Sequence, residues 1–147
     1  MSEIVVRRAR LGDVAEMGAV IRAAYAEFDG VIADLPDASA GLEEEVRDHL
    51  VWVAEADGLL VGVLVLHVEG EVAHLVNVAV APAGRGMGLG QRLIEGAVEA
   101  ARRAGAAVVN LATHKDMPGN VALYERLGWT VAERAGNKVV MSRRLEA

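Results

Sequence analysis

The sequence contains no cysteine. Without a thiol there is no disulfide framework, no thiolate metal site and no cysteine nucleophile, so a covalent route through an enzyme thiol is excluded. The four histidines have no pairwise spacing typical of a metal-binding motif, and we expect no bound metal. The lack of cysteine also agrees with a reducing compartment.

Long apolar runs are missing as well. The longest aliphatic stretch, residues 59–66, is too short to cross a bilayer and is interrupted by Gly62. Glu3, Arg7, Arg8 and Arg10 occupy the first ten positions, where a signal peptide would need an apolar segment. We therefore predict a cytoplasmic protein with no membrane partner.

Basic residues are outnumbered by acidic ones. The net charge is −6 and the isoelectric point is about 5.2, whereas proteins that bind nucleic acid present a concentrated basic face. We expect no nucleic-acid partner. One acidic stretch is either a solvated helix face or an attractant for a cationic substrate. Its members are Glu27, Asp29, Asp34, Asp37, Glu43, Glu44, Glu45 and Asp48.

The length of 147 residues and the hydrophobic content of 53% predict a single domain, residues 1–147. Apolar periodicity and turn residues divide the first half into a strand, two helices and a three-stranded antiparallel meander. The predicted ranges are a strand at 4–8, a helix capped by Asp13, a helix at 40–49, and strands at 51–55, 60–68 and 72–80.

In the second half of the chain, the order of strand, helix and strand predicts a parallel crossover, and a helix and a hairpin follow it. The predicted ranges are a helix at 89–103, a strand at 106–111, a helix at 120–127, and strands at 130–134 and 138–145. Together the two halves predict a mixed sheet with helices on both faces.

The most informative segment is 78–90, where a strand runs through a proline turn into the start of a helix. Five prolines or glycines occupy alternate positions between residues 82 and 90. A helix N-terminus binds anions through unpaired amide groups and the positive end of its dipole, and absent side chains let a phosphate approach. The segment therefore predicts a pyrophosphate site.

Two other phosphate-binding loops fit this segment poorly. A Walker loop ends in Gly-Lys followed by Ser or Thr, but here Gln91 and Arg92 follow Gly90. The dinucleotide fingerprint needs a third glycine where this sequence has Gln91. It also needs an acidic residue near the end of the next strand. Here that strand ends in Ala112, Thr113 and His114, none of which is acidic.

The segment resembles the acetyl-CoA loop of the GNAT superfamily of N-acetyltransferases. In that family a strand ending V-x-V-x-P precedes R/Q-x-x-G-x-G/A, and residues 78–82 and 85–90 match both parts. A second family motif, Tyr followed by a short run to Gly-Phe, is matched by residues 124–129 with Trp129 in place of Phe. The resemblance covers essentially the whole chain. It implies a GNAT-type α/β fold, with a mixed sheet of about seven strands splayed near its centre and about four flanking helices.

The resemblance also implies that acetyl-CoA is the co-substrate. The loop amides would bind its pyrophosphate, and the strand before the loop would pair with its pantetheine arm. Amide groups in the splayed gap would stabilise the oxyanion of the intermediate. The implied cofactor-binding residues are Val78, Ala79, Val80, Arg85, Gly86, Met87, Gly88, Leu89, Gly90, Gln91, Asn120 and Tyr124.

Tyr124 is the predicted general acid. The departing thiolate has an intrinsic pKa of about 8.5, so it gains from a phenol proton when the intermediate collapses. Core packing is the alternative role for this ring. Asn120 lies one helical turn earlier and is expected near the same face, although many relatives place this asparagine further upstream.

The general base is less defined. An alkylammonium with a pKa of about 10.4 must lose a proton before it attacks. Many relatives hold a glutamate in the strand before the loop, but residues 75–77 contain none. His74 is the candidate base, and His67, Glu69 and His114 stay open as alternatives.

These features predict direct transfer of acetyl from acetyl-CoA to a small-molecule or peptide amine in a ternary complex. A non-catalytic acyl-CoA-binding or sensor module is the chief alternative, and an interaction domain without a cofactor is a third. Members of the family often dimerise, so a homodimer is a candidate assembly. The segments 25–36 and 134–138 are expected to border the acceptor pocket.

Overall fold

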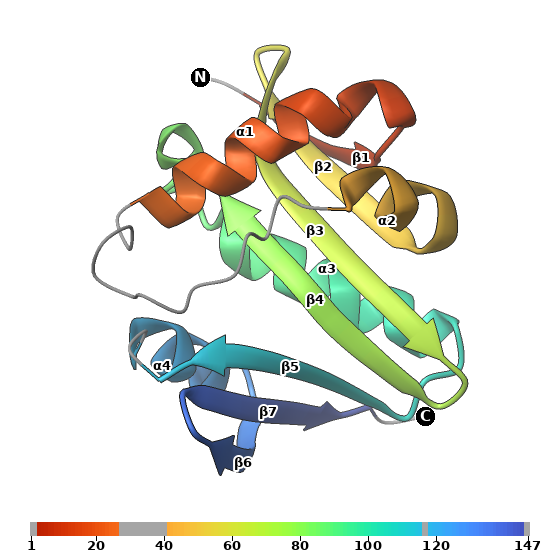
Figure 1. Cartoon of the computed structure of the whole chain (residues 1–147), viewed down its shortest axis with the longest axis vertical. Coiled ribbons are helices and arrows are strands. Elements are labelled where there is room, and N and C mark those ends of the chain that lie inside the picture. The colour runs from red at the N-terminus through yellow and green to blue at the C-terminus, as the bar shows by residue number, and fades with distance from the viewer. Residues whose placement is uncertain (1–2, 27–40, 116–117, 146–147) are drawn as a thin grey trace.

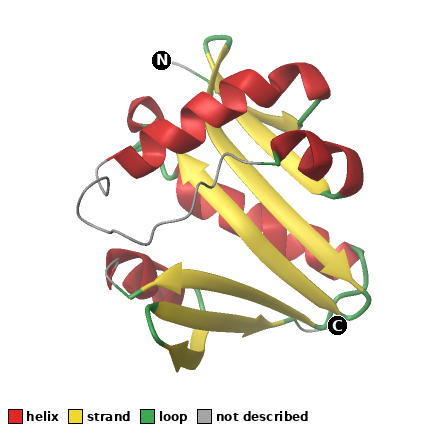
Figure 2. Ribbon diagram, in the orientation of Figure 1, coloured by secondary structure: helices red, strands yellow, loops and turns green. Residues whose placement is uncertain are grey.

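The computed structural model describes residues 3–26, 41–115 and 118–145, and its elements form one mixed sheet with helices on both faces (Figures 1 and 2). The seven strands have the order β1-β2-β3-β4-β5-β7-β6. The predicted fold of about seven strands and four helices is confirmed. In chain order the elements are β1 (Ile4–Arg8), η1 (Leu11–Asp13), α1 (Val14–Tyr25), α2 (Leu42–Asp48), β2 (Leu50–Ala56), β3 (Leu59–Glu69), β4 (Val72–Val80), η3 (Pro82–Gly84), α3 (Leu89–Arg103), β5 (Val108–His114), α4 (Pro118–Arg126), β6 (Thr130–Ala135) and β7 (Lys138–Arg144).

Two apolar cores lie on the two faces of the sheet. Helices α1 and α2 cover one face, where Met17, Ile21 and Leu42 pack against residues of β2 and β3. Helix α3 covers the other face with the apolar stripe that its sequence predicts, and α4 packs against the same core. The buried residues of α3 are Leu89, Leu93, Ile94, Ala97, Val98 and Ala101.

The meander in the middle of the chain closes through turns that the sequence predicts. Asp57 and Gly58 both have positive φ, 54° and 81°, which is the requirement of the tight turn that matches the twist of a hairpin. β2, β3 and β4 then pair antiparallel, as expected. The crossover from β4 through α3 to β5 is parallel, which is also confirmed.

The strand predicted at 106–111 begins two residues later than expected. Gly105 has a φ of 92°, and the Ala106 amide donates 3.0 Å back to the Ala101 carbonyl, which is the bond of a Schellman helix end. Because that amide serves the helix, Ala106 does not join the sheet. The strand instead extends to His114, where it still pairs with Lys138 of β7.

Asp13 stands at the N-cap of α1, as predicted, but its side chain does not cap that helix. Its carboxylate faces backwards, accepting bonds of 2.8 and 2.9 Å from the Arg7 guanidinium and of 2.8 Å from the Arg10 amide. Arg7 also pairs with Glu55 on β2. The prediction of a side-chain cap is therefore wrong, because a bidentate charged partner competes successfully for the same oxygens.

This ion pair predicts a loss of stability in acid. The hydrogen bonds from Arg7 lower the pKa of Asp13 from 3.8 to about 2. A carboxyl whose pKa is depressed in the folded state contributes stability above pH 4, and this is lost as the pH falls toward 2. We expect about 1–2 kcal/mol of the unfolding free energy to disappear over that window in urea titrations. Asp13→Asn should remove this pH-dependent part of the unfolding free energy. The control Asp48→Asn, at an exposed site, should leave it unchanged. Equal pH dependence in the native protein and both variants would contradict the role of the Asp13–Arg7 ion pair.

Glu27, Asp29, Asp34 and Asp37 of the acidic stretch, and most of the segment 25–36, lie outside the described residues. Of the helices in the described part, none is long and apolar enough to cross a membrane.

Candidate active site

The sheet opens between β4 and β5. These parallel strands pair only from Val72 with Val108 to Leu75 with Leu111, and then diverge, as Figure 1 shows. An extra residue, Val76, interrupts the β3 pairing at the same place, because Leu66 pairs with Leu75 and Val65 with Asn77. Such a bulge bends a strand away from its neighbour. The predicted splay is confirmed.

The divergence leaves one edge of β4 without a strand partner. Val78, Ala79 and Val80 pair with β3 on one side, while the described residues of β5 supply no partner on the other. Backbone N–H and C=O groups on such an edge are available to an extended ligand. The structure thus places the three predicted strand residues on the edge that faces the opening.

The glycine-rich loop follows directly from this edge. Gly86 and Gly88 have φ values of 83° and 70°, a conformation that side chains with a Cβ rarely adopt. A Cβ atom built on either residue would meet nothing within 4 Å, so both glycines face open space. The first bond of α3 joins the Arg92 amide to the Gly88 carbonyl, which leaves the amides of Leu89, Gly90 and Gln91 without intrahelical partners.

Two further glycines bring the loop and α3 close to the sheet, a packing role that no sequence pattern predicts for either. A Cβ on Gly62 of β3 would lie 3.1 Å from Leu89 and 3.2 Å from Leu93. A Cβ on Gly84 would lie 3.0 Å from Val61. All three distances are too short for ordinary packing, so these glycines permit the close approach of the helix N-terminus to the end of β4.

Arg85 and Met87 present their side chains outside the loop. The Arg85 guanidinium donates 3.2 Å to the Ala24 carbonyl near the end of α1, and so joins the loop to that helix. Met87 is 47% exposed, which is unusual for a residue of its size and apolar character. Both side chains therefore lie at the surface around the loop, while the Arg85 amide donates 3.2 Å to the Pro82 carbonyl within the preceding turn.

Tyr124 lies on α4 with its ring half-buried. The ring meets Trp129 edge to face at a centroid distance of 5.5 Å, and the Tyr124 carbonyl accepts 3.0 Å bonds from the amides of Leu127 and Trp129. Burial raises the pKa of the Tyr124 phenol well above its usual range, and the nearby Tyr25 phenol raises it further. Tyr124 therefore keeps its proton at neutral pH, as a general acid must.

Tyr25, the last residue of α1, begins the segment 25–36 that is predicted to border the acceptor pocket, and it supplies a second phenol. Its pKa is also raised by burial. Tyr25 packs with the core under α1, whereas Tyr124 packs with the core on the opposite face, yet the two phenols are close enough to interact. α1 ends and α4 lies on the side toward which β4 and β5 diverge (Figure 1).

Asn120 occupies the first turn of α4 and is exposed. Its side-chain amide donates 3.4 Å to the Thr113 hydroxyl near the end of β5. The helix begins at Pro118, two residues before the predicted start, because proline is well suited to a first helical position. Asn120 thus links α4 to the diverging arm of the sheet.

His74 lies at the closed end of the opening. It pairs in register with His67 of β3 and Asn110 of β5, one residue before the last β4–β5 pair. Its neighbours Ala73 and Leu75 belong to the core under α3, so alternation along the strand places His74 on the face covered by α1 and α2. The next polar residue of β4, Asn77, is 8% exposed and begins the unpaired edge.

The other candidate bases have different surroundings. His67 Nε2 lies 2.5 Å from Glu45 Oε2, so this imidazole is already engaged with a carboxylate. Glu69 is exposed at the end of β3. His114 is the last residue of β5, three residues beyond the divergence, and pairs with Lys138. Only His74 and His114 therefore flank the opening among the four candidates.

An open depression of about 360 Å³ lies elsewhere, between the start of α1 and α2. It is lined by Val14, Gly41, Leu42, Glu43, Glu44 and Arg47. None of these residues belongs to the strand edge, the glycine-rich loop or α4, so the depression is separate from the opening between β4 and β5.

A mixed seven-stranded sheet that parts beside a glycine-rich helix N-terminus is the architecture of the acyl-CoA N-acyltransferases. The chain belongs to the acetyltransferase (GNAT) family, whose model matches residues 19–129. The N-acetyltransferase YjgM of Escherichia coli strain K12, itself uncharacterized, is 33% identical over 136 residues, which cover 85% of this chain and 81% of that protein.

Solved structures agree with this fold. The PaiA N-acetyltransferase of Thermoplasma acidophilum in complex with coenzyme A superposes with a TM-score of 0.87 at 19% identity, over 97% of this chain and 99% of that one. YncA of Salmonella typhimurium with its cofactor acetyl-CoA gives a TM-score of 0.77 at 20% identity, over 99% and 96%. Family membership supports acyltransferase activity for this chain.

Proposed function

We propose that this protein transfers an acetyl group from acetyl-CoA to a primary amine by direct attack within a ternary complex. The observation that carries the proposal is the unpaired edge of β4 at 78–80, which leads into the left-handed glycines of the loop. The strand edge offers main-chain bonds to an extended pantetheine arm, and the helix N-terminus offers amides to a pyrophosphate. Two solved relatives, described with coenzyme A and with acetyl-CoA, support the same ligand class.

The residues of the opening supply the remaining chemistry. The amine nitrogen attacks the thioester carbonyl carbon, and the C–S bond breaks when the tetrahedral oxyanion collapses. Tyr124, which burial keeps protonated at neutral pH, gives its proton to the departing thiolate. His74, at the closed end of the opening, receives the proton that the substrate ammonium must lose before its nitrogen can attack. No covalent acyl-enzyme forms, which agrees with the absence of cysteine.

Initial-rate kinetics test this mechanism. Thiol release should depend on both acetyl-CoA and an amine from a panel of polyamines, amino acids and peptides, and double-reciprocal plots should intersect. Parallel plots would indicate a ping-pong route and contradict direct transfer.

A non-catalytic acyl-CoA-binding module is the second candidate, and a specific observation favours it. β4, whose sequence is VAHLVNVAV, contains no carboxylate that could serve as the base. Binding of acetyl-CoA without thiol release to any amine of the panel would support this alternative over the transferase.

A further inference from the structure

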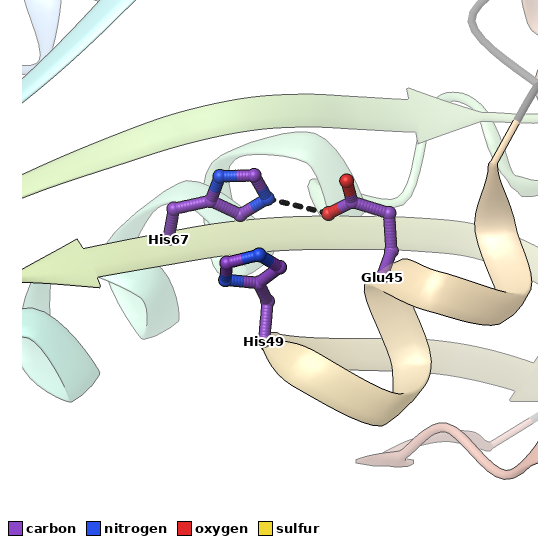
Figure 3. Close-up of side chains that lie close together, drawn as sticks. All are labelled: Glu45, His49 and His67. Carbon is purple, nitrogen blue, oxygen red and sulfur yellow. Dashed lines mark hydrogen bonds and ion pairs between the residues drawn. The ribbon is translucent and has the colours of Figure 1, made fainter.

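We propose that Glu45, His49 and His67 form a binding site for a divalent transition-metal ion, with Zn²⁺ as the best-suited ion. The three side chains converge from α2 and β3 (Figure 3), and their potential ligand atoms all lie within 4.8 Å of one another. This site goes beyond the proposed acyl transfer and differs from the expectation, drawn from histidine spacing, that no metal binds.

The backbone holds all three residues in place. His49 directly follows α2, and its amide donates 2.9 Å to the Glu45 carbonyl, which closes the last turn and brings the two side chains to the same side. Leu50, the next residue, pairs with Leu66 of β3. His49 and His67 therefore lie side by side across neighbouring strands, and their rings stack at a centroid distance of 3.5 Å.

The donor set suits zinc. Zn²⁺ takes imidazole nitrogen and carboxylate oxygen at bonds of about 2.0–2.2 Å, and sites with two histidines and one glutamate leave a fourth position for water or another ligand. Tetrahedral ligands at such bonds are about 3.3 Å apart. The two stacked rings, with an interplanar angle of 18°, would therefore tilt toward a shared ion when it binds. Mg²⁺ and Ca²⁺ prefer oxygen ligands only, which disfavours them here.

The surroundings also favour a cation. The side chains of Glu45 and His67 are 24% and 22% exposed, so the cluster is partly shielded from water but open to entry. Glu43, Glu44 and Asp48 are exposed on the same short helix and make its local field negative.

The site would connect α2 to the sheet beside the acyl-transfer opening. His67 pairs in register with His74, the candidate base on β4. A metal bound at His67 would therefore lie one strand away from the candidate base, and would hold α2 against β3. Binding would stabilise the folded state, because the three ligands converge only there.

Calorimetric titration of untagged, chelator-treated protein with Zn²⁺ tests the site without any need for coenzyme A or turnover. We expect one equivalent to bind and Mg²⁺ not to bind. Free ion at about 100 times the dissociation constant should raise Tm by about 5–10 °C. Co²⁺ in place of Zn²⁺ should show visible absorption of a four-coordinate ion.

Matched variants locate the ion. We expect at least about 10-fold weaker Zn²⁺ binding by each of the variants Glu45→Gln, His49→Gln and His67→Gln. Because glutamine has the same shape as glutamate, Glu45→Gln still tests the site if a histidine variant does not fold. Glu43→Gln on the exposed side of α2 and His114→Gln on β5 should bind within about twofold of the native protein. Absence of stoichiometric binding, or equal binding by the Glu45→Gln variant, would overturn the proposal.

Discussion

Replacing both Gly86 and Gly88 with glutamate is expected to weaken acetyl-CoA binding by at least about 100-fold, which corresponds to about 2.7 kcal/mol. Both residues have positive φ, so a side chain with a Cβ costs roughly 1–2 kcal/mol at each and shifts the loop away from its present shape. The two carboxylates would also stand at the positive end of the α3 dipole, where the pyrophosphate is predicted to bind. Calorimetric titration with acetyl-CoA and with coenzyme A measures the effect.

Controls separate the loss of the site from a loss of the fold. Gly70, in the turn at the other end of β4, has a φ of 63° and also faces open space, so Gly70→Glu carries a similar strain and one of the same charges. It should lower stability without weakening acetyl-CoA binding. Asparagine tolerates positive φ better, so the neutral pair Gly86→Asn and Gly88→Asn should lose less affinity than the glutamate pair. Unchanged binding by the glutamate variant would contradict the assignment of the loop.

Most of the fold could be predicted because local patterns and tertiary packing agree. The stripe of α3 is apolar at helical spacing, so the same residues that predict the helix also bury it. β4 is bounded by Gly70 and Pro82, two strong breakers, and its observed bounds equal the predicted ones. In these elements no long-range contact competes with the local signal.

The differences arise where a distant partner decides. Asp13 has the local signature of a helix cap, but Arg7 on β1 takes its carboxylate. β5 extends through polar Thr113 and His114 because β7 pairs with it along its whole length, and no periodicity in the sequence marks that extension. Such pairing depends on residues about 25 positions away, which local patterns do not encode.

The candidate site divides in the same way. The glycine-rich loop is a contiguous motif, so its residues were recognisable before the structure. The interaction of Tyr25 with Tyr124 and the Glu45–His49–His67 cluster were not, because each arises only when α1, α2, β3 and α4 are brought together. A signal was present in the spacing of Glu45 and His49, which lie one helical turn apart, but the surrounding acidic stretch concealed it.

Tyr124→Phe is expected to lower kcat about 100-fold while leaving the affinity for acetyl-CoA nearly unchanged, since general acids contribute about 10²–10⁴ to rate. Phenylalanine keeps the ring that packs edge to face with Trp129, so the fold and Tm should change little. Only the phenol proton is removed, and the thiolate must then leave without one. Steady-state rates and a parallel titration of binding measure the two effects separately.

Tyr25→Phe provides the matched comparison for this prediction. Tyr25 lies near Tyr124 and raises its pKa, but we assign it no proton transfer. Its loss should reduce kcat by less than about 10-fold, well below the effect at Tyr124. Because the pKa of Tyr124 lies well above its usual range, the native enzyme should also show no fall in kcat from Tyr124 deprotonation at mildly alkaline pH. If Tyr124→Phe retains native turnover, the ring has only the packing role that its contact with Trp129 already supplies.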